Sequence, residues 1–193
     1  MFFLFVLIPF SSSFSHLSCR PITFTDNFNN NTFIFPDITI NVNQNSYNIF
    51  NRTIENNGLK QTARECGKGI ISFSPLSQGM LTDRYLHGIP SDSRVVTDGR
   101  FLHREQLNEK RIHTIQQLND LAVERGESLA QMALKRVLKD SDVTSVLIGA
   151  SKPEQILENL KVMEAAPFTE EELKKIDEIS LSGFTAQTVL FSL

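Results

Sequence analysis

Three short polar stretches of this sequence carry side chains that could bind a ligand: Gln44–Tyr47, Phe73–Gly79 and Gly149–Ser151. The third leads into Lys152-Pro153-Glu154, which is typical of a helix start, where backbone N–H groups and the helix dipole stabilise an anion such as a phosphate. The same pattern, with Ser151 and Glu154 as a capping pair, is also that of an ordinary helix N-cap without a ligand. The residues alone leave both interpretations open.

Several other catalytic and binding motifs are missing from the sequence. It has no G-x-G-x-x-G, no P-loop and no G-x-S-x-G. His103 and His113 lie ten residues apart on one expected helix, which is not a metal-ligand spacing, so we expect both at the surface. Glu170–Glu172 is typical of a charged helix start rather than of a paired catalytic acid and base. A net charge of −3 and a pI near 5.8 give no indication of nucleic-acid binding.

Alternating strands and helices are expected to position the three stretches. The patterns predict strands at 38–43, 69–74 and 143–148, and helices at 59–65, 102–125, 128–139, 153–163 and 169–180. Such alternation favours a parallel sheet with right-handed crossovers. Sites on parallel sheets lie at the carboxyl ends of the strands, and each of the three stretches lies at the end of a predicted strand.

The length of the chain limits the choice of fold. Its 193 residues are too few for a closed (β/α)8 barrel, which takes about 250. The order of the elements therefore leaves two alternatives, a small open α/β sheet or the last three units of a barrel.

The first 37 residues differ in composition from the rest of the chain. They hold nine of the 15 phenylalanines, and the first lysine of the whole chain is Lys60. The apolar run 1–10 has the length of a secretory signal core but lacks a basic start, so residues 1–37 are interpreted as a signal-like or a disordered, non-native extension. The two cysteines, Cys19 and Cys66, and the charged body favour a cytoplasmic protein; a secreted one is the alternative if residues 1–18 act as a signal.

Four motifs in order and spacing resemble the C-terminal half of the aldo/keto reductase superfamily. They are 44–48 (QNSYN), 73–82 (FSPLSQGMLT), 88–94 (GIPSDSR) and 147–159 (LIGASKPEQILEN). The resemblance is greatest to the branch that holds bacterial L-glyceraldehyde 3-phosphate reductase and the potassium-channel β subunits. It covers residues 38–182, which leaves 1–37 as a non-family extension and 183–193 as a tail. It implies an α/β fold, a partial (β/α)8 TIM barrel of about the last three βα units, strands 6–8, with C-terminal helices.

The resemblance also implies an NADP(H) site. Gln44 would hold the nicotinamide carboxamide, and Phe73 would stack on the nicotinamide ring. The loop formed by Ser74, Pro75, Leu76, Ser77 and Gln78 would cradle the pyrophosphate. Arg84 and Arg94 would bring positive charge to the cofactor phosphates. Gly149 and Ser151 would form the turn after the last strand. Gln155, Glu158 and Asn159, at i, i+3 and i+4 on one helix face, would hold the adenosine end.

The resemblance implies no catalytic residue in this chain. The family reduces aldehydes and ketones with an Asp, Tyr, Lys and His set, and its tyrosine is the general acid. All four belong to the first half of the barrel, and neither Tyr47 nor Tyr85 stands at the catalytic position. We therefore expect the chain to be inactive alone, because general-acid and electrostatic contributions are each worth several kcal/mol of the barrier.

A half-barrel is also expected to have edges without partners. The strands at 38–43 and 143–148 would meet other strands in a closed barrel, so we expect unpaired edges, aggregation or a need for a complementing chain. Three hypotheses remain: the cofactor-binding half of a reductase, a non-catalytic NADP(H)-binding or interaction module, and a fragment without a stable fold. No metal ion, nucleic acid or membrane span is expected.

Overall fold

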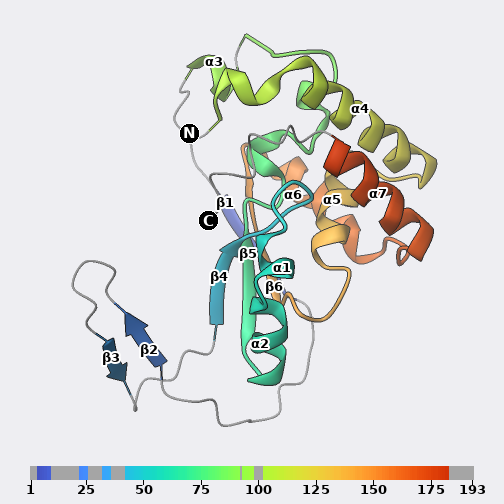
Figure 1. The fold of residues 1–193 in the computed structure, drawn as a ribbon. Coiled ribbons are helices and arrows are strands. Elements are labelled where there is room, and N and C mark those ends of the chain that lie inside the picture. Colours follow the sequence, from blue (N-terminus) through green and yellow to red (C-terminus); the bar gives the residue numbers. More distant parts are fainter. Residues whose placement is uncertain are drawn as a thin grey trace.

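A four-stranded sheet forms the centre of the protein (Figure 1). The computed structural model describes residues 4–9, 22–25, 32–35, 42–91, 93–97 and 102–182. The strands of the sheet are β1 (Leu4–Pro9), β4 (Val42–Ser46), β5 (Gly69–Phe73) and β6 (Ser145–Ala150), in the order β1-β6-β5-β4. The strands β4, β5 and β6 are parallel, as predicted, whereas β1 runs antiparallel to β6. The strands β2 (Ile22–Thr25) and β3 (Thr32–Phe35) form a separate antiparallel pair.

Helices connect the parallel strands and follow the last of them. They are α1 (Thr53–Asn56), α2 (Leu59–Glu65), α3 (Arg94–Thr97), α4 (Glu109–Glu124), α5 (Leu129–Val137), α6 (Pro153–Leu160) and α7 (Glu170–Ser182). Short 3-10 turns lie at Ser77–Gly79, Asp83–Tyr85, Arg104–Leu107 and Lys161–Met163. None of the helices in the described ranges is long and apolar enough to cross a bilayer.

One face of the sheet is buried against helices. Ile70 of β5 and Val146 and Ile148 of β6 are almost fully buried and pack with Leu134 and Val137 of α5. The opposite face is more open, because Val42 is 46% exposed and Gln44 is exposed as well. Side chains of a strand alternate between the two faces, so the residues directly before and after a buried core residue point to the open face.

A second apolar cluster holds the C-terminal helices together. Ile115 and Leu118 of α4 pack with Met132 of α5 and Ile176 of α7, and all four are fully buried. Tyr85, from the loop between β5 and α4, belongs to the same cluster. This cluster fixes the long β5–α4 connection against the helices, and with it the loop that follows β5.

The predicted strands are present, but two of them are shifted. The predicted strand 38–43 is described only from Val42, and it continues to Ser46 because β4 stays in register with β5 up to the Ser46–Phe73 pair. The predicted strand 143–148 begins at Ser145 and continues to Ala150. Gln44 and Gly149, expected just after their strands, therefore lie within them.

One predicted helix begins later than expected, and three end at other residues than expected, because α5 ends at Val137, α6 at Leu160 and α7 at Ser182. The helix predicted over 102–125 begins at Glu109, because the side chain of Asn108 accepts a hydrogen bond from the Arg111 N–H (2.9 Å) and so caps it there. The helix predicted over 128–139 is confirmed as α5, and reciprocal bonds between Ser128 and Gln131 cap its start. The last predicted helix is confirmed as α7, and a capping box of Thr169 and Glu172 precedes it.

The expectation of an unpaired edge at the last parallel strand is wrong. The strand β1 covers that edge of β6 over six residues, from the Leu4–Ala150 pair to the Pro9–Ser145 pair. Its sequence, LFVLIP, is apolar throughout, and it stands opposite a strand whose Val146 and Ile148 are buried. Of the three parallel strands, β4 is therefore the one that forms an edge of the described sheet.

Candidate functional site

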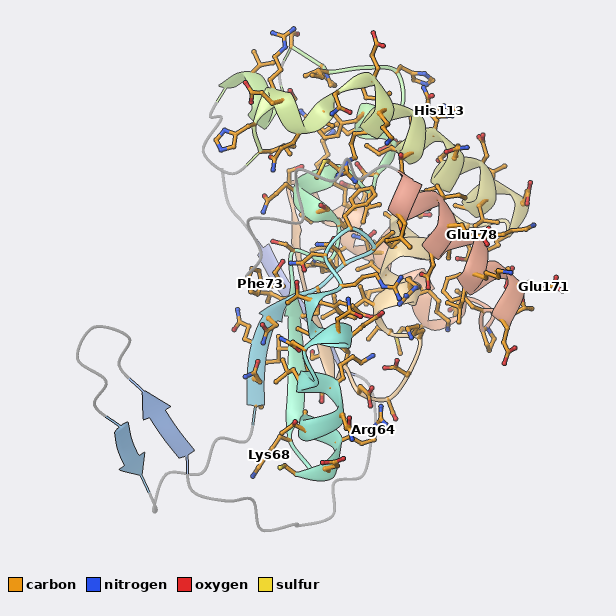
Figure 2. The ribbon with its side chains drawn as sticks, in the orientation of Figure 1. Arg64, Lys68, Phe73, His113, Glu171 and Glu178 are labelled. Atoms are coloured by element: carbon orange, nitrogen blue, oxygen red, sulfur yellow. The ribbon has the colours of Figure 1, made fainter. Side chains whose placement is uncertain are left out.

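The carboxyl ends of β4 and β5 lie side by side at one edge of the sheet. Ser46, the last residue of β4, pairs with Phe73, the last residue of β5. Gln44 pairs with Ile71, two residues before Phe73, so Gln44 and Phe73 lie on the same face. This is the open face, where Gln44 is exposed and Phe73 is half-buried. Figure 2 shows the position of Phe73 beside the ends of these strands.

The register of β6 brings the third predicted stretch to the same face. Ser145 pairs with Ile71, and Gly149 lies four residues further along β6, where it is exposed. The structure thus places Gln44, Phe73 and Gly149 on one face of three neighbouring strands, although Gln44 and Gly149 lie within their strands rather than just after them.

The loop after β5 contains backbone conformations that are rare for residues other than glycine. Ser74, Ser77 and Gln78 have φ values of 52°, 48° and 59°, in the left-handed region. Each such residue costs roughly 1–2 kcal/mol relative to a right-handed conformation. Strain of this kind persists only where the surroundings enforce it, and it gathers at binding and catalytic sites. The clustering of three such residues in five positions is therefore a functional signal in its own right.

Hydrogen bonds hold this loop from within. The Ser77 N–H donates to the Ser74 carbonyl oxygen (3.0 Å), and the Leu81 N–H donates to the Leu76 carbonyl oxygen (3.2 Å). The Gln78 side-chain amide donates to the Ser74 hydroxyl oxygen (3.2 Å). Two side chains of the predicted loop, those of Ser74 and Gln78, are thus engaged with one another.

Further bonds join the end of β4 to the end of β5. The Tyr47 N–H donates to the Phe73 carbonyl oxygen (3.3 Å), and the Ser72 hydroxyl donates to the Tyr47 carbonyl oxygen (2.9 Å). The side-chain amide of Asn48 donates to the Ser74 carbonyl oxygen (2.9 Å). The turn after β4 therefore supports the loop after β5.

The two predicted phosphate-binding arginines lie further along the same connection. Arg84 is exposed in the 3-10 turn Asp83–Tyr85, which is capped by Thr82, whose hydroxyl accepts from the Arg84 N–H (3.3 Å). Arg94 is the first residue of α3, and its side chain lies outside the described part of the structure.

The turn after β6 differs from the prediction. We expect Ser151 and Glu154 to form the capping pair, but Lys152 is the N-cap residue of α6, and the side-chain oxygen of Gln155 makes the bonds. It accepts hydrogen bonds from the Ser151 N–H (2.9 Å), the Ser151 hydroxyl (3.1 Å) and the Lys152 N–H (3.3 Å). Backbone donors that were predicted to meet an anion are therefore already used, and an anion here would compete with Gln155.

The predicted adenosine-binding residues do not form one open surface. Gln155 and Glu158 are exposed, whereas Asn159 is only 6% exposed. Glu158 accepts a hydrogen bond from the Gln131 side-chain amide (2.9 Å) and forms an ion pair with Lys161 (2.7 Å). The bond to Lys161 holds the pKa of the Glu158 carboxyl below its usual range.

A buried ionic network lies directly behind the turn after β4. Tyr47, 1% exposed, donates a hydrogen bond from its hydroxyl to Glu55, and Arg136 of α5 donates to both of them (3.2 Å and 3.0 Å). Arg52 donates to the second oxygen of Glu55 (2.7 Å), and Asp177 of α7 accepts from Arg136 (3.1 Å). The network fixes α1, α5 and α7 around the turn that supports the candidate site.

The charges of this network shift the pKa values of its members. Burial, partly offset by Arg136, and the bond to Glu55 raise the pKa of the Tyr47 hydroxyl well above its usual range. Burial alone would raise the pKa of Glu55, but the bond from Tyr47 and the charges of Arg136 and Arg52 outweigh it and lower the pKa to about 2. The sequence does not reveal this network, because Tyr47 and Arg136 are 89 residues apart and each has an ordinary local context.

Comparison with known proteins assigns the chain to a family. The sequence model of the aldo/keto reductase family matches residues 35–181. The chain belongs to the aldo/keto reductase family. The match runs from the end of β3 into α7, and β1 and β2 lie outside it. It confirms the resemblance on which the predicted cofactor residues are based.

Individual aldo/keto reductase relatives agree with the family assignment. L-glyceraldehyde 3-phosphate reductase from Escherichia coli strain K12 is 45% identical over 149 residues, which are 76% of this chain and 43% of the relative. A probable voltage-gated potassium channel subunit beta from Oryza sativa subsp. japonica is 34% identical over 141 residues, 72% of this chain and 43% of the relative. The chain thus spans less than half the length of the curated relatives it matches.

A solved structure shows the same fold for the matched part. The glycerol dehydrogenase from Gluconobacter oxydans aligns with a TM-score of 0.58 at 28% identity, over 72% of this chain and 41% of that one. The three parallel strands with their helices are thus consistent with part of the barrel of the aldo/keto reductase family.

His103 and His113 are exposed, as predicted, and Figure 2 shows His113 on α4.

Proposed function

We propose that this aldo/keto reductase chain binds NADP(H) along the carboxyl edge of β4, β5 and β6. The observation that carries the proposal is the loop after β5, in which three left-handed non-glycine residues lie next to an exposed amide and a half-buried aromatic ring on one face. An amide, an aromatic face and a tight backbone turn match the carboxamide, ring and phosphates of a nicotinamide dinucleotide. The residues present therefore fit the cofactor that the resemblance implies.

Each of these residues would have a separate task. Gln44 would orient the carboxamide, Phe73 would cover one face of the ring, and residues 74–78 would surround the pyrophosphate. Arg84 and Arg94 would neutralise phosphate charge. The bound cofactor supplies the hydride, and the chain's own residues bind it and exclude water from its ring.

We propose that reduction of an aldehyde or ketone needs groups from outside these 193 residues. The two tyrosines of the chain support this view, because Tyr47 and Tyr85 are each only 1% exposed. The Tyr47 hydroxyl donates a hydrogen bond to Glu55 within the buried network, and its raised pKa is the opposite of what a general acid near neutral pH requires.

Hydride transfer tests this part of the proposal. The purified chain, mixed with NADPH and methylglyoxal, is expected to give no oxidation of NADPH above background. Addition of the separately expressed N-terminal part of the Escherichia coli reductase is expected to restore turnover, because it would supply the missing groups. Turnover by the 193-residue chain alone, abolished by Arg94→Ala, would contradict the proposal.

A non-catalytic NADP(H)-binding module is the second candidate function. The burial of both tyrosines favours it, because cofactor binding needs neither of them. Such a module binds NADPH saturably and stays inactive with every complementing half-barrel, which separates it from the first candidate.

The remaining hypothesis, an unstable fragment, predicts a different physical state. It requires that the chain show no cooperative thermal transition by circular dichroism and elute as an aggregate in size exclusion. The cover that β1 gives to β6 weakens its main argument, the unpaired edges. For the cellular location we propose the cytoplasm, on the charged body of the chain, whereas the disulfide bond of Cys66 favours the secreted alternative. A reporter fused after residue 37 would detect secretion.

A further inference from the structure

Asn48 is a buried amide whose side chain makes three hydrogen bonds in two directions. It lies two residues after β4 and is only 4% exposed. Its side-chain oxygen accepts from the N–H groups of Phe50 and Asn51, both at 2.9 Å. Its side-chain nitrogen donates to the carbonyl oxygen of Ser74, also at 2.9 Å. The acceptor therefore forms the turn after β4, while the donor reaches the loop after the neighbouring strand.

The carbonyl that Asn48 binds belongs to the first strained residue of that loop. Ser74 has a φ of 52°, and its carbonyl oxygen also accepts the Ser77 N–H at 3.0 Å. The Ser74 carbonyl is thus fixed by one donor from within the loop and by one from outside it. Ser77 and Gln78, the other two left-handed non-glycine residues, follow directly in the segment that this carbonyl anchors.

We infer that Asn48 is a positioning residue for the loop 74–79, and that it tunes cofactor affinity without touching the cofactor. The inference rests on the proposed function for the identity of the ligand. A buried donor that holds a strained carbonyl lowers the population of relaxed loop conformations, so less of the binding free energy is spent on ordering the loop.

Substitutions at Asn48 can separate the role of its side-chain nitrogen, which donates to the loop, from that of its side-chain oxygen, which forms the turn. Asn48→Asp keeps the oxygen that accepts from residues 50 and 51 but has no donor for Ser74 when ionised. Asn48→Ala removes both halves. Any effect on the loop that the two variants share is therefore due to the lost donor, because Asn48→Ala adds no charge.

Ser72→Ala is the matched control. The Ser72 hydroxyl is fully buried and donates to the Tyr47 carbonyl oxygen at 2.9 Å, so it joins the same two strand ends without reaching the loop. Its loss is expected to lower the melting temperature, because a buried hydrogen bond between the two strand ends is lost, and to leave the loop in place.

The experiment combines hydrogen exchange with NADPH titration of the full 193-residue chain. Amide exchange in peptides covering 74–81 is expected to rise about tenfold in Asn48→Ala and Asn48→Asp and to stay unchanged in Ser72→Ala. Exchange at residues 50–51 is expected to rise only in Asn48→Ala. The Kd for NADPH is expected to rise about fivefold or more in both Asn48 variants and less than twofold in Ser72→Ala.

Two results would overturn the inference. One is loop exchange and a Kd that stay within twofold of the wild-type values in both Asn48 variants. The other is a Kd for Ser72→Ala that rises as much as that of Asn48→Ala, which would make the effect one of general stability. If the wild-type chain binds no NADPH, the proposed function fails and the claim about cofactor affinity fails with it, while unchanged loop exchange would separately refute the positioning role.

Discussion

The substitution Glu55→Gln tests the buried network by its dependence on pH. Glu55 is 13% exposed and receives hydrogen bonds from Tyr47, Arg52 and Arg136. These groups lower its pKa from 4.5 to about 2. A carboxyl whose pKa is lowered by folding stabilises the protein in full above pH 4.5, and this contribution is lost as the pH falls through 4.5 toward 2.

The expected contribution of Glu55 to stability follows from its pKa values, 4.5 without the network and about 2 within it. At pH 7 the difference corresponds to about 3 kcal/mol of stability, at 1.36 kcal/mol for each tenfold change. At pH 3 the unfolded carboxyl is protonated and the folded one is still mostly ionised, which leaves about 1.4 kcal/mol. The stability difference between the wild type and Glu55→Gln should therefore shrink by about 2 kcal/mol between pH 7 and pH 3.

Urea denaturation at both pH values measures this difference directly. Other carboxyl groups also protonate over the range, but their contributions cancel between the two proteins. Glu178→Gln is the control, because the Glu178 side chain is 66% exposed on α7 and its nearest cation, Lys174, is 3.9 Å away (Figure 2). It should change the free energy of unfolding by less than about 0.5 kcal/mol at either pH. If the free energies of unfolding of the wild type and of Glu55→Gln differ by the same amount at pH 7 and at pH 3, the lowered pKa of Glu55 is refuted.

Three further substitutions test other parts of the fold. Arg136→Met should lower the free energy of unfolding by about 2–3 kcal/mol in urea melts at pH 7, since it removes one of the two cations that pair with Glu55 and Asp177 and leaves only Arg52, and a loss below about 1 kcal/mol would contradict the buried pairing. Ser77→Gly should raise the free energy of unfolding by about 1 kcal/mol, because glycine adopts the left-handed conformation without strain; a decrease would argue against strain at that position. Phe5 and Gly149 stand directly opposite one another in the β1–β6 pair. Phe5→Cys with Gly149→Cys should therefore cross-link on mild oxidation, as mapped by mass spectrometry, because the Cα atoms of directly opposed residues in antiparallel strands lie about 4.5–5.5 Å apart. Val6→Cys with Gly149→Cys, one residue out of register, should not, and equal yields from both pairs would exclude the observed β1–β6 register.

The sequence predicts best what local signals determine. The helices around 59–65 and 128–139 have clear apolar spacing and ends, and both lie where expected. The strand at 69–74 is a short apolar run bounded by Gly69 and Pro75, and β5 matches it within one residue. The order of these elements is sufficient to predict the parallel sheet and the edge at which the site lies.

Tertiary partners decide the features that the sequence does not predict. The strand β6 extends to Ala150, where β1 pairs with it, and the local sequence of 143–150 does not indicate that a distant strand will pair there. Gln155, rather than Ser151, provides the bonds at the start of α6, because its longer side chain can reach three donors at once. The left-handed serines after β5 also have no sequence signal, since serine is common in ordinary turns.

Titration of the chain with NADPH, followed by cofactor fluorescence, tests the central claim most directly. We expect saturable binding with a Kd below about 1 mM, weakened about tenfold or more by Gln44→Ala and by Phe73→Ala and unchanged by Glu178→Gln. Binding that never saturates below about 1 mM, or that is indifferent to both site substitutions, would contradict a cofactor site at the carboxyl edge of β4, β5 and β6.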